Sequence, residues 1–492
     1  MYRKSITFIL ALVLILPILQ AQQPGEISYK DTSVSPNGKV GERIQTLIKT
    51  VNSNDPDKIK LFLGEACTER FRKMAPMDQH VQVFQGFRAE TGGVDFHSIR
   101  TYVPAREDET IVILKDRNYG SWRAFSIQFD NSNDKLIGSL SFNIARTPSN
   151  VTEPPLKEDQ VIDEVREIVG RLSQNNTFSG TVLIAKKDKV LYSAAAGEAS
   201  KRYHIPNNID TKFNLGSMNK MFTSLSIMKL VEDGKLALDD TLDNYLDESW
   251  LPKDKTSKIT IHHLLSHTSG LGSYFNRKYM ESSRLLWEAL DDYKPLVESE
   301  RLAFTPGDRF RYSNTGMFLL GVVIEKVTGE DYFDYIRENI YSPAGMKNSD
   351  CYEMNRPVEN LAIGYSPDPQ NHWGWKNNIY DHVVKGGPAG GGFSTVKDLH
   401  LFAQAVLKEK YVSRKSLEKM WTDQAQSNYG YGFGIDEGPQ GKIVGHSGGF
   451  SGINSNLDIF VDSGYIVAVM SNVDNGASPL ATKIKELIER IK

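Results

Sequence analysis

A break in the apolar pattern at residues 147–156 constrains the fold of this chain most, because different repeats lie on its two sides. Prolines at 148, 154 and 155 fall within this short stretch. Such a composition is typical of a connector between domains. A chain of 492 residues is also too long for one compact core. We therefore predict a linker over 147–156 with one domain on each side.

Helical spacing followed by strand spacing characterises the region before this linker. Apolar residues over 40–51 recur at helical intervals, and from about Phe96 the period changes to two, with strand-like runs at 111–114, 125–129 and 136–144. Helices followed by an antiparallel meander predict a small α+β domain. We place it at 40–146, after a polar extended leader at 22–39. The element order resembles the nuclear-transport-factor-2-like (NTF2-like) fold.

Three roles stay open for this first domain: substrate binding, a cap over the second domain, or contacts in a homo-oligomer. Its sequence contains no constellation of catalytic residue types.

The region over 157–492 has strands near both ends and a helical middle. An amphipathic stripe runs from Val161 to Leu172, strands are predicted at 181–185 and 190–193, and further strands at 457–461 and 465–470. A last amphipathic helix covers 480–491. We predict an α+β domain whose antiparallel sheet is assembled from both ends of the domain.

The first 21 residues have the layout of a secretory signal peptide. Arg3 and Lys4 precede the apolar run Ile6–Leu19, and Ala21 supplies a small residue for cleavage. The run contains Pro17 and is shorter than the roughly 20 residues of a spanning helix. We predict an exported protein, periplasmic or secreted, with no stable membrane insertion after cleavage. An uncleaved anchor is the alternative.

Charge and cysteine content exclude several function classes. The formal net charge of -3 provides no basic surface for nucleic acid. Cys67 and Cys351 fall in different predicted domains, so we expect two separate thiols rather than a disulfide. Neither has the Cys/His spacing of a metal site, and we expect no metal or other cofactor.

Ser217 and Lys220 are the first candidate catalytic pair. They fall at the start of a predicted helix, one turn apart on one face. A serine hydroxyl needs a neighbouring base, and a lysine amine can act as one if burial lowers its pKa. Alone, the same residues also fit a capping serine and a solvent-facing lysine.

Two further segments carry residues suited to acyl transfer. Tyr312 could relay a proton and Asn314 could bind a substrate amide, although this segment also fits a turn and helix cap. His446 precedes Gly448 and Gly449 in a predicted strand, where glycines permit close approach of a substrate. A glycine bulge is the alternative there.

In this order, the three segments resemble the Ser-x-x-Lys, Tyr-x-Asn and Lys/His-x-Gly motifs of serine β-lactamases and penicillin-binding proteins. Their spacing is similar to that of class C β-lactamases and related D,D-peptidases and esterases. The segments 261–271 and 390–399 also resemble that family, and we assign them structural roles, with Ser394 or Thr395 as a helix cap.

The resemblance implies a β-lactamase/D,D-peptidase-like fold and a set of site roles. Ser217 forms an acyl-enzyme while Lys220 and Tyr312 move the proton. Amides of Ser217 and Gly449, with Gly448 beside them, form the oxyanion hole, and Asn314 orients the substrate. His446 stands where β-lactamases usually have lysine, and so favours a D,D-peptidase-like, aminopeptidase-like or esterase activity on a small substrate.

Two other interpretations remain. The chain could be a β-lactamase, or an inactive, peptide-binding member of the fold. The string 445–449 also matches a Gly-x-Ser-x-Gly nucleophile elbow, but that fold needs a histidine after the serine and His446 is the last one. Loop aromatics at 274, 275, 373, 375 and 380 are candidates for lining a substrate groove.

Overall fold

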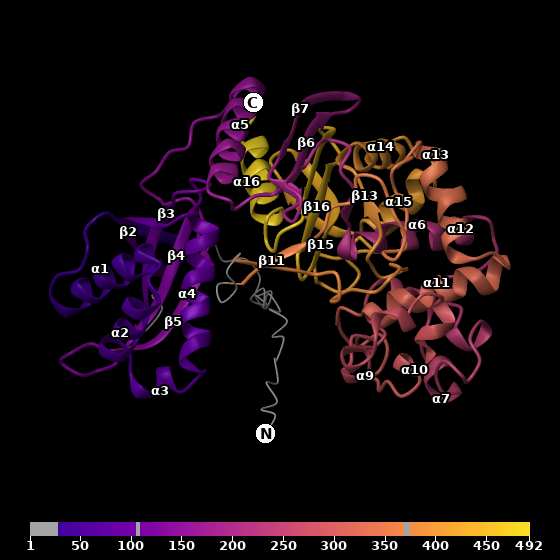
Figure 1. The fold of residues 1–492 in the computed structure, drawn as a ribbon, viewed down its shortest axis with the longest axis horizontal. Coiled ribbons are helices and arrows are strands. Elements are labelled where there is room, and N and C mark those ends of the chain that lie inside the picture. The colour runs from indigo at the N-terminus through magenta and orange to yellow at the C-terminus, as the bar shows by residue number, and fades with distance from the viewer. Residues whose placement is uncertain (1–27, 105–108, 369–373) are drawn as a thin grey trace. The chain divides into compact units, whose positions relative to one another are not determined.

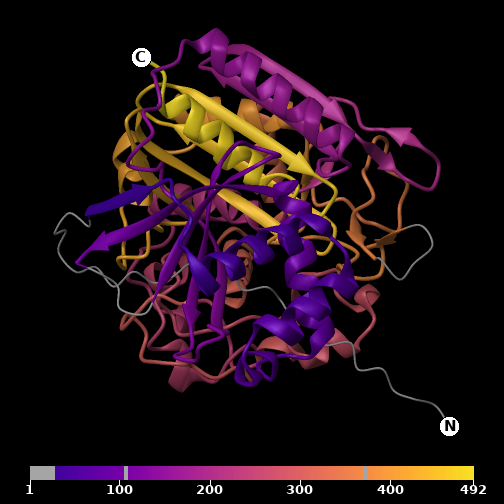
Figure 2. The same cartoon turned by 90° about the vertical axis from the view of Figure 1, so that its left-hand side faces the viewer.

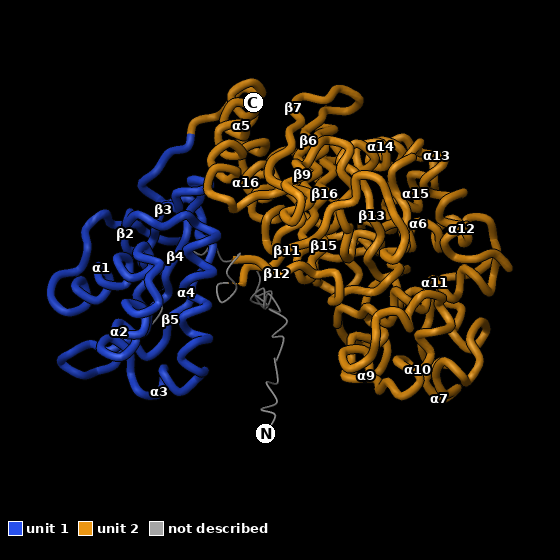
Figure 3. Tube along the Cα trace, in the orientation of Figure 1, with its two compact units in different colours: residues 1–153 blue, residues 154–492 orange. Residues whose placement is uncertain are grey.

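The computed structural model describes residues 28–104, 109–368 and 374–492. The predicted signal peptide therefore lies outside the described residues. The chain divides into two compact units between residues 153 and 154, inside the predicted linker (Figure 3). Within the described ranges we find no helix of the length and hydropathy needed to cross a membrane.

The first unit is an antiparallel sheet whose helices all lie between its first and second strands in sequence. The sheet order is β1-β2-β3-β4-β5, and each neighbouring pair is antiparallel. The strands are β1 (Ser28–Thr32), β2 (Val94–Val103), β3 (Thr110–Asp116), β4 (Trp122–Phe129) and β5 (Ile137–Ile144). The helices are α1 (Gly38–Ser53), α2 (Pro56–Ala66), α3 (Glu69–Arg72) and α4 (Met77–Thr91).

Apolar side chains at helical spacing bind the helices of this unit to its sheet. Ile44 and Leu47 of α1 are fully buried in a core shared with the strands. Phe87 of α4 stacks on Phe142 of β5 at 4.5 Å between ring centroids. Each fully buried side chain of this size contributes about 1.5–3 kcal/mol.

The predicted leader differs from the structure, because Ser28–Thr32 is an edge strand of the sheet. Its sequence is polar and shows no apolar alternation. Instead, the buried Asp31 carboxylate pairs with Arg100 of β2 at 3.0 Å and accepts the Ser149 amide at 2.7 Å. The strand is thus held by backbone pairing and one buried ion pair, which periodicity does not reveal.

The second unit contains a six-stranded antiparallel sheet built from both ends of the domain, as the sequence predicts. Its order is β14-β15-β16-β17-β6-β7. β17 from the C-terminal part pairs with β6 from the N-terminal part, with Met470 opposite Thr181. The strands are β6 (Gly180–Lys186), β7 (Lys189–Ala196), β14 (Gly434–Gly438), β15 (Gly441–Phe450), β16 (Ile453–Phe460) and β17 (Tyr465–Ser471).

Helices cover both faces of this sheet (Figure 1). On one face α5 (Glu158–Gln174) and α16 (Ser478–Glu489) pack against each other, and Figure 2 shows them side by side. On the other face α14 (Val396–Leu407) contacts β6 and β17. Both α5 and α16 carry the apolar stripes that the sequence predicts.

Two buried helices form the centre of the helical region. α6 (Asn219–Glu232) and α11 (Asn314–Thr328) pack against each other, and each is buried on nearly all sides. A helix that is apolar all round belongs in the interior. The 3-10 turn η1 (Gly216–Met218) leads directly into α6.

Short elements connect these parts. They are β8 (Glu198–Ser200), β9 (Ile205–Pro206), β10 (Phe213–Asn214), η2 (Leu242–Asn244), α7 (Lys253–Thr256), α8 (Ile261–Leu265), α9 (Arg277–Glu281), η3 (Arg284–Leu286), η4 (Leu290–Tyr293), α10 (Lys294–Val297), α12 (Tyr332–Ile336), η5 (Arg337–Tyr341), α13 (Ser342–Ala344), β11 (Tyr365–Pro367), β12 (Trp375–Asn377), β13 (Phe393–Ser394) and α15 (Arg414–Met420).

Candidate active site

Ser217 lies in the 3-10 turn before α6, and its hydroxyl is not used as a helix cap. Neither η1 nor α6 has a side-chain cap. Instead, the Ser217 side chain interacts with Tyr312 and lowers the pKa of that phenol. The capping interpretation of this serine is therefore wrong, and its oxygen is free to react.

Lys220 is fully buried one turn after Ser217. Its ammonium nitrogen donates to Asn314 Oδ1 at 2.9 Å and to the carbonyl of Ala389. Both partners are neutral, so neither holds the lysine in its charged form. Burial lowers the pKa of Lys220 well below its usual value. The side chain is thus suited to act as a base, and a solvent-facing lysine is excluded.

Tyr312 bridges the pair. Its ring centroid lies 4.9 Å from the Lys220 nitrogen, and its phenol interacts with the Ser217 side chain. Although 38% of the residue is exposed, burial of its hydroxyl raises the phenol pKa above the usual value. The resting phenol therefore keeps its proton and can pass it on while another group accepts one.

Asn314 is the first residue of α11 and contacts the base directly. Its Oδ1 accepts from Lys220, and its Nδ2 donates to Ser273 Oγ at 3.2 Å. The preceding Ser313 is the actual cap, because its hydroxyl oxygen accepts the Gly316 amide at 2.8 Å. The structure thus brings Asn314 to Lys220, and its predicted contact with a substrate amide stays a prediction.

Strand β15 passes close to the turn that carries Ser217. A Cβ atom on Gly448 would lie 1.9 Å from the Leu215 carbonyl oxygen, and one on Gly216 would lie 2.8 Å from the Gly449 nitrogen. Glycine at 448 is required by this approach. A Cβ on Gly449 would meet nothing closer than 3.9 Å, so packing does not require glycine there.

The outer edge of β15 is open beside Ser217. β14 pairs with β15 only through residues 441–445, which leaves 446–450 without a strand on that side among the described residues. The same edge includes the amide of Gly449, a predicted oxyanion donor, near the turn of Ser217. An extended substrate backbone can add to such an edge.

His446 is neutral in this site. Its Nδ1 donates to the Ser447 carbonyl, and so its Nε2 accepts from the Tyr429 hydroxyl at 3.0 Å. Burial and the nearby Lys220 lower the pKa of His446 to about 3. The side chain therefore supplies no permanent positive charge where β-lactamases have lysine.

His267 and Tyr429 also belong to this site, and we assigned neither a role from sequence. His267 is fully buried, and its ring centroid lies 4.4 Å from that of Tyr312 and 4.8 Å from that of Tyr429. The only sequence signals were the family-like segment 261–271, which includes His267, and the glycines at 430 and 432 that follow Tyr429.

The Gly-x-Ser-x-Gly alternative does not fit the structure. Ser447 lies within strand β15, not on a turn from a strand into a helix, and it is exposed. The glycine-rich segment 390–399 is structural as predicted, with Thr395 as the cap: its hydroxyl oxygen accepts the Asp398 amide at 3.1 Å. Its glycines hold the catalytic turn, since the Gly391 amide donates to the Gly216 carbonyl at 3.0 Å.

Of the predicted groove aromatics, Tyr274 is core, only 6% exposed and packed on Phe318. Phe275 stacks on Phe450 at the end of β15. Trp375 is half-buried in β12, Tyr380 is 87% exposed, and residue 373 lies outside the described ranges.

Cys67 and Cys351 are both buried and unpaired. Across the described part of the chain, no cluster of three or more His, Cys, Asp or Glu side chains is arranged to hold a metal ion.

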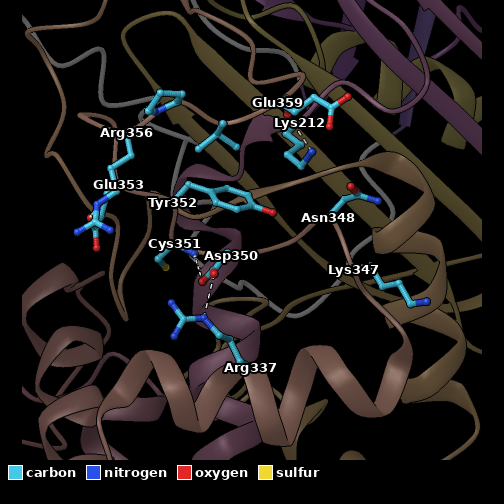
Figure 4. A pocket seen from close by; sticks show the side chains of 12 residues that line it. Lys212, Arg337, Lys347, Asn348, Asp350, Cys351, Tyr352, Glu353, Arg356 and Glu359 are labelled. Atoms are coloured by element: carbon cyan, nitrogen blue, oxygen red, sulfur yellow. Dashed lines mark hydrogen bonds and ion pairs between the residues drawn. The ribbon is translucent and has the colours of Figure 1, made fainter.

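A cavity of about 440 Å³ lies apart from Ser217 (Figure 4). Lys212, Asp350 and Tyr352 are among its lining residues. Its link to the site is indirect: Cys351 lines it, and the Cys351 sulfur accepts from the Asn219 side chain at 3.5 Å. The cavity is therefore not the reaction site.

Comparison with known proteins gives the family. The family model described as Beta-lactamase matches residues 159–489. The chain belongs to the β-lactamase family. This assignment confirms the resemblance seen in the sequence, and members of the family are serine hydrolases.

Individual relatives of this β-lactamase-family chain carry different functional names. A penicillin-binding protein of Bacillus subtilis (strain 168) is 31% identical over 318 residues, 61% of this chain and 69% of that protein. An esterase of Burkholderia gladioli is 31% identical over 212 residues, 40% of this chain and 53% of the esterase. The crystal structure of a penicillin-binding protein from Bacillus halodurans has a TM-score of 0.58 and 29% identity, covering 67% of this chain and 98% of that one.

The family match at residues 159–489 lies within the second unit. The NTF2-like resemblance of residues 40–146 therefore stays a prediction.

Proposed function

We propose that this protein is an exported serine hydrolase that cleaves small peptide or ester substrates through an acyl-enzyme on Ser217. The observation that carries the proposal is the contact of Ser217 with Tyr312 beside a fully buried Lys220 whose partners are neutral. An inactive binding protein has no need for a lysine buried at this cost.

In the first step Ser217 Oγ attacks the substrate carbonyl carbon. Its proton passes to the Lys220 amine, directly or through the Tyr312 hydroxyl, as the C–O bond forms. The negative charge that develops on the carbonyl oxygen is stabilised by the amides of Ser217 and Gly449.

The second step expels the leaving group. The bond from the carbonyl carbon to the leaving amine or alcohol breaks, and Tyr312 donates a proton to it while it recovers one from Lys220. Water then attacks the acyl-enzyme by the same route, which releases the acid and restores the serine.

Two features favour peptides or esters over β-lactams. The neutral His446 gives no fixed cation for a penicillin carboxylate. The open edge at 446–450 suits an extended backbone. One relative is an esterase and another a penicillin-binding protein, and these relatives support keeping both esters and peptides as candidate substrates. Export rests on the predicted signal peptide at 1–21.

The test is the intact mass of the purified protein after incubation with a fluorophosphonate. We expect one adduct in the wild type and in Ser447→Ala, and none in Ser217→Ala. Ser447 is the matched control, because it is the serine of the rival motif. An adduct that survives in Ser217→Ala places the nucleophile elsewhere. A folded wild type without any adduct supports the inactive binding protein.

Three substrates then distinguish the classes: a D-amino-acid peptide, an ester with the same acyl group, and benzylpenicillin. We expect hydrolysis of the D-amino-acid peptide or ester and only slow acylation by benzylpenicillin. Turnover of the penicillin faster than that of both other substrates would make the protein a β-lactamase.

A further inference from the structure

His267 adopts an unusual backbone conformation. Its φ is 57°, and it is the one non-glycine residue with positive φ that is buried within the described ranges. Such a conformation is unfavourable for a residue with a side chain and persists only where the surroundings fix it. Buried residues in such conformations are concentrated at functional sites. The contacts of His267 are therefore candidates for a functional role.

His267 accepts hydrogen bonds from the two amides that flank Tyr312. Its carbonyl oxygen accepts the Arg311 amide at 2.8 Å, and its ring Nδ1 accepts the Ser313 amide at 3.1 Å. Its ring also packs against the Tyr312 ring at 4.4 Å, with 42° between the planes. One residue thus contacts the backbone on both sides of Tyr312 and one face of its phenol.

The tautomer of His267 follows from these contacts. A backbone amide only donates, so Nδ1 carries no hydrogen, and in the neutral ring the hydrogen is on Nε2. Nε2 is buried and has no hydrogen-bond partner among the described residues. A buried polar atom without a partner is costly. Packing alone would favour an apolar side chain here, so the acceptor at Nδ1 is the feature that explains a histidine.

We propose that His267 is a positioning residue that holds the Tyr312 hydroxyl at Ser217 through the amides of residues 311 and 313. This inference rests on the proposed function, in which Tyr312 gives a proton to the leaving group. It predicts a selective defect. A leaving group of high pKa needs that proton as its bond breaks, whereas p-nitrophenolate leaves without one.

The test compares two esters with the same acyl group, one releasing p-nitrophenol and one releasing ethanol. In His267→Leu, kcat/KM for the ethyl ester should fall about 100-fold, the scale of a small misplacement of a catalytic group. For the p-nitrophenyl ester the loss should stay within about threefold.

Two further variants isolate the acceptor. Asn places its Oδ1 near the position of Nδ1 and tolerates positive φ. In His267→Asn, kcat/KM for the ethyl ester should therefore be about tenfold higher than in His267→Leu. His267→Gln carries its oxygen one atom further and should recover none. The pair decides the question even if His267→Leu does not fold.

Phe310→Leu is the matched control. Its ring centroid lies 5.8 Å from that of His267, but its side chain accepts no hydrogen bond from the amides beside Tyr312. Any loss in this variant should be equal for both esters.

Equal losses on both esters in His267→Leu, or equal rates for the Asn and Gln variants, would overturn the role of His267. Fluorophosphonate labelling of Ser217 in the same samples separates this result from failure of the proposed function, which unlabelled, folded wild type would indicate.

Discussion

The Lys220 nitrogen lies 2.9 Å from Asn314 Oδ1, so the first turn of α11 supplies a neutral partner for a base carried by α6. A carboxylate at the same distance would keep the lysine protonated. The amide oxygen accepts one hydrogen bond from the amine without adding a negative charge that would raise the lysine pKa. The amine can therefore be unprotonated, as a base for Ser217 must be.

Removal of the amine should separate activity from stability. In Lys220→Met we expect acylation to fall by about 10²–10⁴-fold, the usual contribution of a general base. Between the lowered folded pKa and the unfolded value, the unfolded chain binds a proton that the folded chain does not. The unfolding free energy of the wild type therefore rises with pH across that interval. Urea unfolding at several pH values should show a weaker rise in Lys220→Met; an unchanged pH dependence would contradict a neutral Lys220.

A carboxylate in place of the Asn314 amide should raise the pKa of Lys220. We expect the rising limb of the pH–rate profile of Asn314→Asp to move to higher pH by at least about one unit, which corresponds to 1.36 kcal/mol. The measurement is kcat/KM for an uncharged ester from pH 5 to 10. Asn339→Asp, which changes the charge at a side chain that donates to the Tyr335 carbonyl, is the control. If the rising limbs of the wild type and Asn314→Asp lie at the same pH, Lys220 is not the titrating base.

The two glycines of β15 should differ in their tolerance of a methyl group. Gly448→Ala brings a carbon against the Leu215 carbonyl and should cost about 1–3 kcal/mol of stability, with loss of activity as the Ser217 turn shifts. Gly449→Ala, which makes only ordinary van der Waals contacts, should cost less than about 0.5 kcal/mol. Thermal unfolding of both variants checks this. Equal decreases in Tm would contradict the predicted difference between the two glycines.

A lysine at position 446 should improve recognition of a penicillin. His446→Lys introduces the fixed cation that the neutral imidazole lacks, and a hydrogen bond to a charged group contributes about 1.5–3 kcal/mol. We expect acylation by benzylpenicillin to rise about tenfold, while kcat/KM for an uncharged ester stays within about threefold. His204→Lys, at an exposed histidine, serves as the comparison. A rise in that variant as well would reveal a general charge effect.

The sequence predicts the elements whose residues repeat regularly. The stripe of α16 and the strands paired through Met470 and Thr181 follow from periodicity, and the family motifs correctly bring Ser217, Lys220 and Tyr312 together. β1 escapes prediction because its polar residues are held by the Asp31–Arg100 pair rather than by an apolar face.

The contacts of His267 escape prediction for a different reason. Its side chain binds an amide 46 residues further along the chain, and its φ depends on the loop after α8. Neither property changes the local pattern of apolar and polar residues. Similarly, nothing near Tyr429 in sequence indicates that its hydroxyl donates to His446 Nε2.

The join between β6 and β17 also sets the order of maturation. A chain that emerges from a ribosome or a secretion channel presents the nucleophile early, but the strand that lies against its turn and the strand that closes the sheet arrive among the last segments. Until then the strand that carries the proposed oxyanion donor, the Gly449 amide, has not been delivered. Synthesis itself thus delays completion of the proposed site until almost the whole domain has been delivered.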